Sequence, residues 1–213
     1  MMALSTYQTV KGAGEHEIII QKSRFIAFFD RVETEAAAQA FIEKLKKQHW
    51  NATHNCSAYL IGERDEIQKA NDDGEPSGTA GVPMLEVLKK RGLKDTVVVV
   101  TRYFGGIKLG AGGLIRAYGG AVSEGLKEVG TVKRSLTQIV HTEIDYHWLG
   151  KVEHALRESP YQMKGIDYLE QVDVQTYVEI DQLEEFVAWM TNITNGQAAI
   201  KRGEETYLEV DVK

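Results

Sequence analysis

The pattern of hydrophobic and polar positions predicts short strands alternating with helices in the first half of the chain. Near the start, the stretches EIIIQKS and RFIAFFD favour either one bent strand or a hairpin around residues 22–24. Further along, apolar residues recur at helical spacing in two segments, each with lysines near its C-terminal end. The predicted elements are strands at Glu17–Ser23, Arg24–Asp30 and Asn55–Ile61, and helices at Glu33–Gln48 and Pro83–Arg91.

The stretch Val97–Gly125 is the one around which the rest of the first half is organised. It opens with β-branched residues, Val97–Thr101, whose composition is typical of a strand buried on both faces. Five glycines then fall between Gly105 and Gly113, a density that indicates close backbone approach or positive φ angles. A helix follows whose apolar side is formed by Leu114, Tyr118, Ala121, Val122, Leu126 and Val129.

The second half of the chain is expected to form a separate domain. A boundary is expected around Gly130–Ser135, where the long helix ends and the charge balance changes sign, which gives domains at 1–132 and 133–213. The order of elements beyond it, βαββαβ, matches the ferredoxin-like arrangement. These elements are strands at Leu136–Tyr146, Gln162–Tyr168, Val172–Ile180 and Thr206–Val212, and helices at Leu149–Ser159 and Leu183–Ile193.

Composition places the chain among soluble globular proteins and excludes several classes of site. Of its 213 residues 43% are hydrophobic and 26% charged, and no window reaches the ~18 apolar residues of a membrane span. A single cysteine, Cys56, excludes an internal disulfide and a multi-thiolate metal centre. Residues 1–134 hold 19 Lys+Arg and 16 Asp+Glu, whereas residues 135–213 hold 6 and 15. Only the first half has a charge balance suited to a polyanion.

The glycine-rich turn carries a one-sided charge. No acidic residue occurs from Thr96 to Ser123, a segment that contains Arg102, Lys108 and Arg116. Free backbone N–H groups and the start of a helix dipole favour an anion at such a turn. The alternative is that the glycines allow tight packing of the helix on the sheet and that the cations are only solvated. The residues alone leave both interpretations open.

The turn does not match the common phosphate-binding motifs. Ala111 and Gly112 occupy the positions where a Walker A loop needs lysine and a hydroxyl residue. The dinucleotide-binding fingerprint fails as well, because Ile115 stands at its third glycine position and no acidic residue follows at the required distance. We therefore predict neither an NTPase nor a Rossmann enzyme.

A second turn-rich stretch, Asn71–Pro83, concentrates carboxylates. Asp72, Asp73 and Glu75 could bind a hard cation or form a pair with separated pKa values, although the calcium-loop pattern fails. Alternatively, they hydrogen-bond their own backbone or pair with Arg102 or Arg116. His54 and Cys56 are two residues apart on a predicted strand, a spacing that gives little support for a nucleophile and its base.

Three long motifs resemble those of one known family. They are ATHNCSAY (residues 52–59), DDGEPSGTAG (residues 72–81) and VVVVTRYFGGIKLGAGGLIRAYG (residues 97–119), and SRFIA (residues 23–27) fits as well. Together they span nearly all of the first half and resemble the bacterial YigZ branch of the IMPACT family. The acidic second half is similar to the family's C-terminal domain in position, length and element order.

The resemblance implies an α+β protein of two domains. The first would be a split βαβ sandwich like a small-subunit ribosomal protein domain and domain IV of elongation factor G, and the second a ferredoxin-like domain similar to domain V of that factor. It also implies a role in regulating translation, through an activator of the initiation-factor kinase in eukaryotic relatives and through the ribosome or RNA in bacteria. It brings no established catalytic residue, and this sequence lacks the metal ligands of the proline peptidases with which some members have been labelled.

We therefore predict a cytoplasmic regulator of translation that binds the ribosome, RNA or a translation-linked protein through its first domain. We expect no catalytic residue, metal, cofactor, membrane association or DNA sequence specificity. The rival hypothesis is an enzyme or binding protein for a small phosphorylated or carboxylated ligand held between the loops Asp72–Gly81 and Gly105–Gly113. The predicted anion- or RNA-binding residues are Arg102, Tyr103, Gly105, Gly106, Lys108, Gly110, Gly112 and Arg116. The predicted supporting or ligand loop comprises Asp72, Asp73, Glu75, Ser77 and Thr79.

Overall fold

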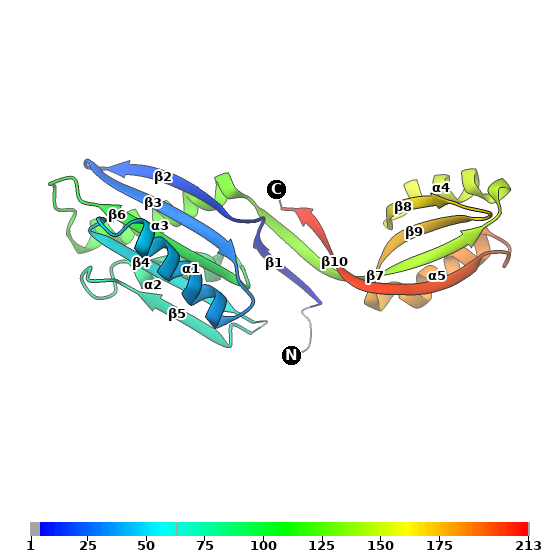
Figure 1. The fold of residues 1–213 in the computed structure, drawn as a ribbon, viewed down its shortest axis with the longest axis horizontal. Helices are drawn as coiled ribbons and strands as arrows, with labels where there is room; N and C mark the ends of the chain where they lie inside the picture. The colour runs from blue at the N-terminus through cyan, green and yellow to red at the C-terminus, as the bar shows by residue number, and fades with distance from the viewer. Residues whose placement is uncertain (1–4, 63, 213) are drawn as a thin grey trace. The chain divides into compact units, whose positions relative to one another are not determined.

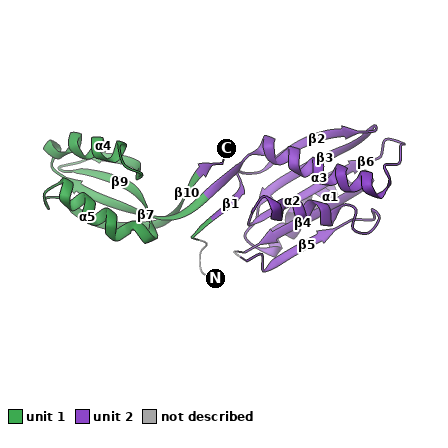
Figure 2. Ribbon diagram, turned by 180° about the vertical axis from the view of Figure 1, so that it is seen from behind, with its two compact units in different colours: residues 1–6, 134–209 green, residues 7–133, 210–213 purple. Residues whose placement is uncertain are grey.

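The computed structural model describes residues 5–62 and 64–212, which divide into two compact units of mixed α+β structure (Figures 1 and 2). Of the described residues, the N-terminal unit contains 7–62, 64–133 and 210–212, and the C-terminal unit contains 5–6 and 134–209. Each unit is built on its own sheet and its own hydrophobic core. An α+β protein of two domains, as predicted, is confirmed.

The N-terminal unit is a five-stranded sheet with helices on both faces. The strand order is β2-β3-β6-β4-β5, in which β3 and β4 run parallel and β6 lies between them. The segment β3-α1-β4 is thus the split βαβ unit that the resemblance implied. The elements are β2 (Gly14–Ile20), β3 (Ser23–Arg31), α1 (Glu35–Gln48), β4 (His54–Ile61), β5 (Ile67–Asn71), α2 (Gly81–Lys90), β6 (Thr96–Tyr103) and α3 (Gly110–Val129).

The alternation of β6 sorts its side chains between two cores. Val98 and Val100 point into the larger core beneath α2 and α3, whereas Val97 and Val99 pack with α1 on the opposite face. Side chains alternate along a strand, so Arg102 lies on the same face as Val98 and Val100 and points toward α3. A strand buried on both faces, as predicted from its β-branched residues, is confirmed.

The C-terminal unit has the ferredoxin-like order of elements. Antiparallel pairing places β10, β7, β9 and β8 side by side, and β1 belongs to the same sheet. Its core consists of aliphatic residues of β7 and β9 packed against the two helices, with Phe186 and Met190 fully buried. The strands of this sheet and the helices beside it are β1 (Thr6–Val10), β7 (Thr131–Ile144), α4 (Leu149–Arg157), β8 (Gln162–Tyr168), β9 (Val172–Glu179), α5 (Leu183–Ile193) and β10 (Ala199–Asp211), with short 3-10 turns at Tyr146–Trp148 and Ile180–Gln182. Most of β1 and the first residues of β7 belong to the N-terminal unit.

Of the two alternatives for the N-terminal strands, the hairpin is confirmed, and its turn lies one to two residues earlier than the centre predicted from the sequence. β2 ends at Ile20 and β3 begins at Ser23, so Gln21 and Lys22 form a two-residue turn, and both adopt positive φ angles of 46° and 66°. Such turns match the right-handed twist of the flanking strands but are usually made by Asn or Gly. Among the described helices, none is long and apolar enough to cross a membrane.

Candidate functional site

The two loops singled out in the sequence lie at the same end of the N-terminal sheet (Figure 1). β5 and β6 both run antiparallel to β4, so both end where β4 begins. The β2–β3 turn lies there too, because Arg24 pairs with Tyr103. We call this region the loop end, defined by residues 20–23, 49–54, 72–81 and 104–113. Helices α2 and α3 both begin at the loop end.

Asp72 closes the N-terminus of α2. Its Oδ1 accepts hydrogen bonds from the backbone N–H groups of Ala80 (3.0 Å) and Gly81 (2.8 Å), and its Oδ2 accepts one from Gly78 (2.8 Å). Burial alone would raise the pKa of Asp72, but these three donors lower it below its ordinary value. Asp72 therefore acts as the anion of this helix N-terminus.

Asp73 and Thr79 of the β5–α2 loop are also bound within the protein, whereas the Ser77 side chain is not bound to any described residue. Asp73 accepts a hydrogen bond from Lys46 (2.9 Å) and another from the backbone N–H of Asn55 (2.7 Å). The Thr79 hydroxyl donates to the carbonyl of Pro76 (2.6 Å), while Ser77 is exposed. These contacts match the interpretation in which the loop stabilises its own conformation.

Glu75 and Arg102 form a buried ion pair between the β5–α2 loop and the end of β6. Arg102 Nη1 donates to Glu75 Oε1 over 2.6 Å, and the Tyr118 hydroxyl donates to the same oxygen over 2.8 Å. Both ionised side chains are almost fully buried, with exposed fractions of 6% and 3%. These contacts connect the acidic loop to the end of strand β6 and to α3.

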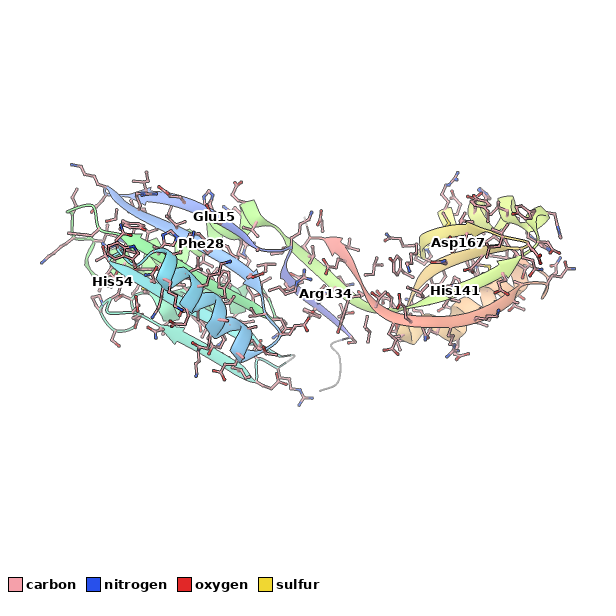
Figure 3. The ribbon with its side chains drawn as sticks, viewed as in Figure 1. Glu15, Phe28, His54, Arg134, His141 and Asp167 are labelled. Carbon is pink, nitrogen blue, oxygen red and sulfur yellow. The ribbon has the colours of Figure 1, made fainter. Side chains whose placement is uncertain are left out.

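His54 lies at the start of β4 (Figure 3), and its ring is close to Glu75. Its Nε2 is 3.8 Å from the second oxygen of Glu75, and its Nδ1 is 2.8 Å from the backbone oxygen of Asp73. Cys56 lies two residues further on, with Sγ 3.4 Å from the Tyr118 hydroxyl. Burial raises the pKa of Cys56 to about 12 and also raises that of Tyr118. A thiol with such a pKa is a poor nucleophile at neutral pH.

Two aromatic rings flank the guanidinium of Arg102. Its carbon Cζ lies 5.3 Å from the ring centre of Phe25 and 5.5 Å from that of Phe104. Its Nε is buried and has no hydrogen-bond partner among the described residues. The predicted phosphate contact of Arg102 stays a prediction, but its side chain is held in place by Glu75 and the two rings.

The glycines of the β6–α3 loop serve different purposes. A Cβ on Gly105 would lie 2.1 Å from the backbone carbonyl carbon of Lys22, so any larger residue must displace the β2–β3 turn. Gly106 and Gly110 adopt positive φ angles of 86° and 71°, which favour glycine. Gly112 lies exposed in the first turn of α3, with only Arg116 Nη1 near its missing Cβ, at 3.6 Å.

The N-terminus of α3 is open. No side chain among the described residues caps it, its first turn contains no acidic residue, and residues 110–112 are exposed. Lys108 and Arg116 are exposed beside it and make no ion pair within residues 5–62 and 64–212. Arg116 folds back over Gly112 toward the helix start. Unpaired N–H groups, the helix dipole and two cations together create a position suited to an anion.

Tyr103, the last of the predicted residues, contacts other side chains of the protein. Tyr103 is half-buried, and its hydroxyl lies 2.9 Å from Nδ1 of His49. The guanidinium of Arg24 also lies over the ring of Tyr103, 5.3 Å from its centre.

In the described part of the chain no three His, Cys, Asp or Glu side chains are grouped to hold a metal ion.

Comparison with known proteins places this site in a family. The Impact N-terminal domain model matches residues 21–126, and a domain of unknown function, DUF1949, matches residues 142–197. The chain is 68% identical to the IMPACT family member YvyE of Bacillus subtilis (strain 168), over 97% of this chain and 95% of that protein. The chain belongs to the IMPACT family. The resemblance drawn from the sequence motifs is thereby confirmed.

Further relatives agree with this assignment. The IMPACT family member YigZ of Escherichia coli (strain K12) is 35% identical over 87% of this chain and 92% of its own length. A crystal structure described as that of a hypothetical protein superposes with a TM-score of 0.60 at 32% identity, covering 95% of this chain and 99% of that one. Relatives from eukaryotes that carry the IMPACT name match as well. Every predicted site residue falls within the part matched by the IMPACT N-terminal model.

Two residues that contact or adjoin Glu75 beside Arg102 were not predicted as site residues. Tyr118 occupies the apolar side of the α3 pattern, where a tyrosine needs a partner for its hydroxyl, and that requirement was the available signal. His54 was considered only with Cys56. Its position opposite Arg102 depends on the pairing of β4 with β6, which no local pattern in the sequence specifies.

Proposed function

We propose that this IMPACT family protein is a cytoplasmic regulator of translation whose N-terminal unit binds RNA, such as the RNA exposed on the ribosome. The observation that carries the proposal is the open N-terminus of α3 beside Lys108 and Arg116. Phosphate oxygens satisfy backbone N–H groups at such a position and gain from the dipole. The family's implied role in translation agrees with this ligand.

The charges of the loop end support a polyanion rather than a cation as partner. Asp72 is surrounded by backbone donors, Asp73 is paired with Lys46, and Glu75 is paired with Arg102. The carboxylates of the loop are therefore neutralised from within, while Lys108 and Arg116 stay available. Arg102 contributes by fixing Glu75 and Phe104 rather than by reaching solvent, because it is buried.

Co-sedimentation with ribosomes across a salt series tests the proposal. Lys108→Ala and Arg116→Ala should each weaken binding and lower the slope of log K against log salt by about 1, because each removes one phosphate contact. The matched control is Lys90→Ala, an exposed lysine at the C-terminal end of α2. The proposal is wrong if both site variants keep the affinity and salt slope of the unmodified protein.

The alternative of a small phosphorylated or carboxylated ligand predicts a different result. Inorganic phosphate or a phosphorylated metabolite would then raise the melting temperature at concentrations near its Kd. An RNA-binding site with several weak phosphate contacts would show no such stabilisation by a single small anion. A thermal-shift screen of the full chain therefore separates the two hypotheses.

A further inference from the structure

The loop end exposes two aromatic side chains that the anion site does not use. Trp50 is 82% exposed, the largest exposure of any large apolar side chain in the described part of the chain. Phe104, at the start of the glycine loop, is 47% exposed. Tryptophan is usually well buried, so such exposure has no explanation in the packing of this unit.

The two aromatics lie on backbone segments that are bonded to each other. The Thr53 N–H donates to the carbonyl of Arg102 over 2.8 Å, and the Phe104 N–H donates to the Thr53 hydroxyl over 3.0 Å. The Tyr103 hydroxyl lies 3.5 Å from Oδ1 of Asn51. The turn that follows α1, which carries Trp50, is thereby fixed to the strand end that carries Phe104.

The ring of Phe104 is also fixed in orientation. The guanidinium of Arg102 lies over it, and Glu75 holds that guanidinium in turn. A ring covered on one side by a buried cation and exposed over about half its surface is preorganised to stack on a flat partner. The buried ion pair therefore acts as a support for an exposed aromatic surface.

Exposed cations lie at the same end of the sheet as these rings. Lys22 lies exposed on the β2–β3 turn and, like Lys108 and Arg116, makes no ion pair with any residue of 5–62 and 64–212. Aromatic rings with cations around them are the combination by which proteins hold unpaired nucleotides, the rings stacking on bases and the cations tracking the phosphates. Charge complementarity thus favours a nucleic acid over an apolar protein segment.

We propose that Trp50 and Phe104 are stacking platforms for unpaired bases, so that the RNA recognised at the loop end is single-stranded. This inference rests on the proposed function and adds the class of RNA. In a duplex each base stacks on its neighbours and is not available to a protein ring, whereas bases of loops and single strands can be splayed onto one. The anion position at α3 would then hold the backbone of the same strand.

Affinity measurements with three probes test the platforms. A fluorescently labelled single-stranded RNA, the same sequence as a duplex, and inorganic polyphosphate are titrated with the full chain. Trp50→Leu and Phe104→Leu should each weaken single-strand binding by about 5- to 100-fold. Both should leave polyphosphate binding unchanged, because polyphosphate has charge but no bases. Tyr168→Leu is the matched control, an aromatic residue of the C-terminal unit that is 61% exposed.

Tryptophan emission gives an independent measurement. A base stacked on Trp50 should quench its fluorescence, and the quenching should disappear in Trp50→Phe while the affinity stays within about threefold, since phenylalanine keeps a stacking face. Trp148 and Trp189 remain in that variant as internal references. Quenching that persists in Trp50→Phe would overturn the assignment of this residue.

The outcomes separate this inference from the proposed function. Equal affinity for the single strand and the duplex, unaffected by Trp50→Leu and Phe104→Leu, refutes the platforms and leaves phosphate binding intact. Absence of binding to RNA and polyphosphate alike refutes the proposed function itself. If Trp50→Leu abolishes co-sedimentation with ribosomes while neither variant affects the purified RNA, the surface binds a protein and the inference is wrong.

Discussion

Helices α2 and α3 begin at the same end of the same sheet, yet their N-termini are treated differently. At the start of α2, the N–H groups of Ala80 and Gly81 are satisfied by the carboxylate of Asp72. Those of α3 receive no side-chain cap and no acidic neighbour. Both termini carry the positive end of a helix dipole, but the chain supplies its own anion to only one.

The difference teaches which of the two termini is available to a ligand. A missing N-cap forgoes about 0.5–2 kcal/mol of stability. The glycines of the α3 loop add further backbone entropy loss on folding. The start of α3 gives up stability in both ways, whereas the start of α2 is stabilised by Asp72. This contrast fits the general rule that binding sites are less stabilised than their scaffold.

Breaking the ion pair between the β5–α2 loop and β6 should change stability most. Glu75→Ala leaves Arg102 buried without its partner and should lower the free energy of unfolding by about 3–5 kcal/mol. Urea denaturation measures the loss. The double variant Glu75→Leu, Arg102→Met should recover most of it, because no buried charge is then left unpaired. A single variant as stable as the unmodified protein would contradict a structural role for the pair.

The next effect distinguishes two glycines of the same loop. Gly105→Ala should destabilise the protein by about 1–3 kcal/mol, because its methyl group overlaps the backbone of Lys22. Gly112→Ala has space and should stabilise α3 by up to about 1 kcal/mol. Thermal unfolding of the two variants compares them directly. Equal effects would mean that the close approach at Gly105 does not constrain the loop.

Removing the anion of α2 should have an intermediate effect that depends on pH. Asp72→Ala should cost about 0.5–2 kcal/mol at neutral pH, because three backbone donors lose their acceptor. Since folding lowers the pKa of Asp72, its contribution is present above the ordinary value of about 4 and is lost as the pH falls through the lower folded value.

The measurement is the difference in unfolding free energy between the unmodified protein and Asp72→Ala across the acidic range. Using the difference removes the contributions of other carboxyls with lowered pKa values, such as Glu17 and Glu35. The difference should shrink toward zero in acid. A constant difference would show that the carboxylate charge of Asp72 is not what caps α2.

The smallest effect on stability is the most direct test of the comparison. Ala111→Asp supplies α3 with an acidic residue in its exposed first turn and should stabilise the protein by about 0.3–1 kcal/mol. The same change should weaken RNA binding, because the new carboxylate occupies the anion position and repels phosphate from it. Ala111→Asn, which is uncharged, is the control. Unchanged RNA affinity in Ala111→Asp would contradict the proposed site.

Much of the fold could be predicted because hydrophobic periodicity is strong in its central elements. The predicted strand Gln162–Tyr168 and helix Leu183–Ile193 coincide with β8 and α5. By contrast, β5 (IQKAN) was missed because it is a polar, largely exposed edge strand without alternation. The first part of β10 was missed for the same reason, so the strand begins at Ala199 rather than at residue 206.

The candidate site was predictable only in part. The absence of acidic residues around the glycine turn is a property of sequence, and it indicated Lys108 and Arg116 directly. The burial of Arg102 follows from the period of β6, in which it shares a face with Val98 and Val100. Pairing of the acidic loop with Arg102 was one of the alternatives that the sequence left open, and the contact between Glu75 and Arg102 confirms it. Which of the three carboxylates would be the partner could not be predicted, because it depends on how the strands are ordered, which no local pattern specifies.

Because Gly105 packs closely against the backbone of Lys22, the β2–β3 turn cannot change in length without moving the glycine loop. The turn has only two residues, both in left-handed conformations that non-glycine residues adopt at some cost, so it has little freedom to yield. An insertion there would push directly on the glycine loop and shift the start of α3. This hairpin tip is consequently a poor place for a tag or a circular permutation, exposed though it is.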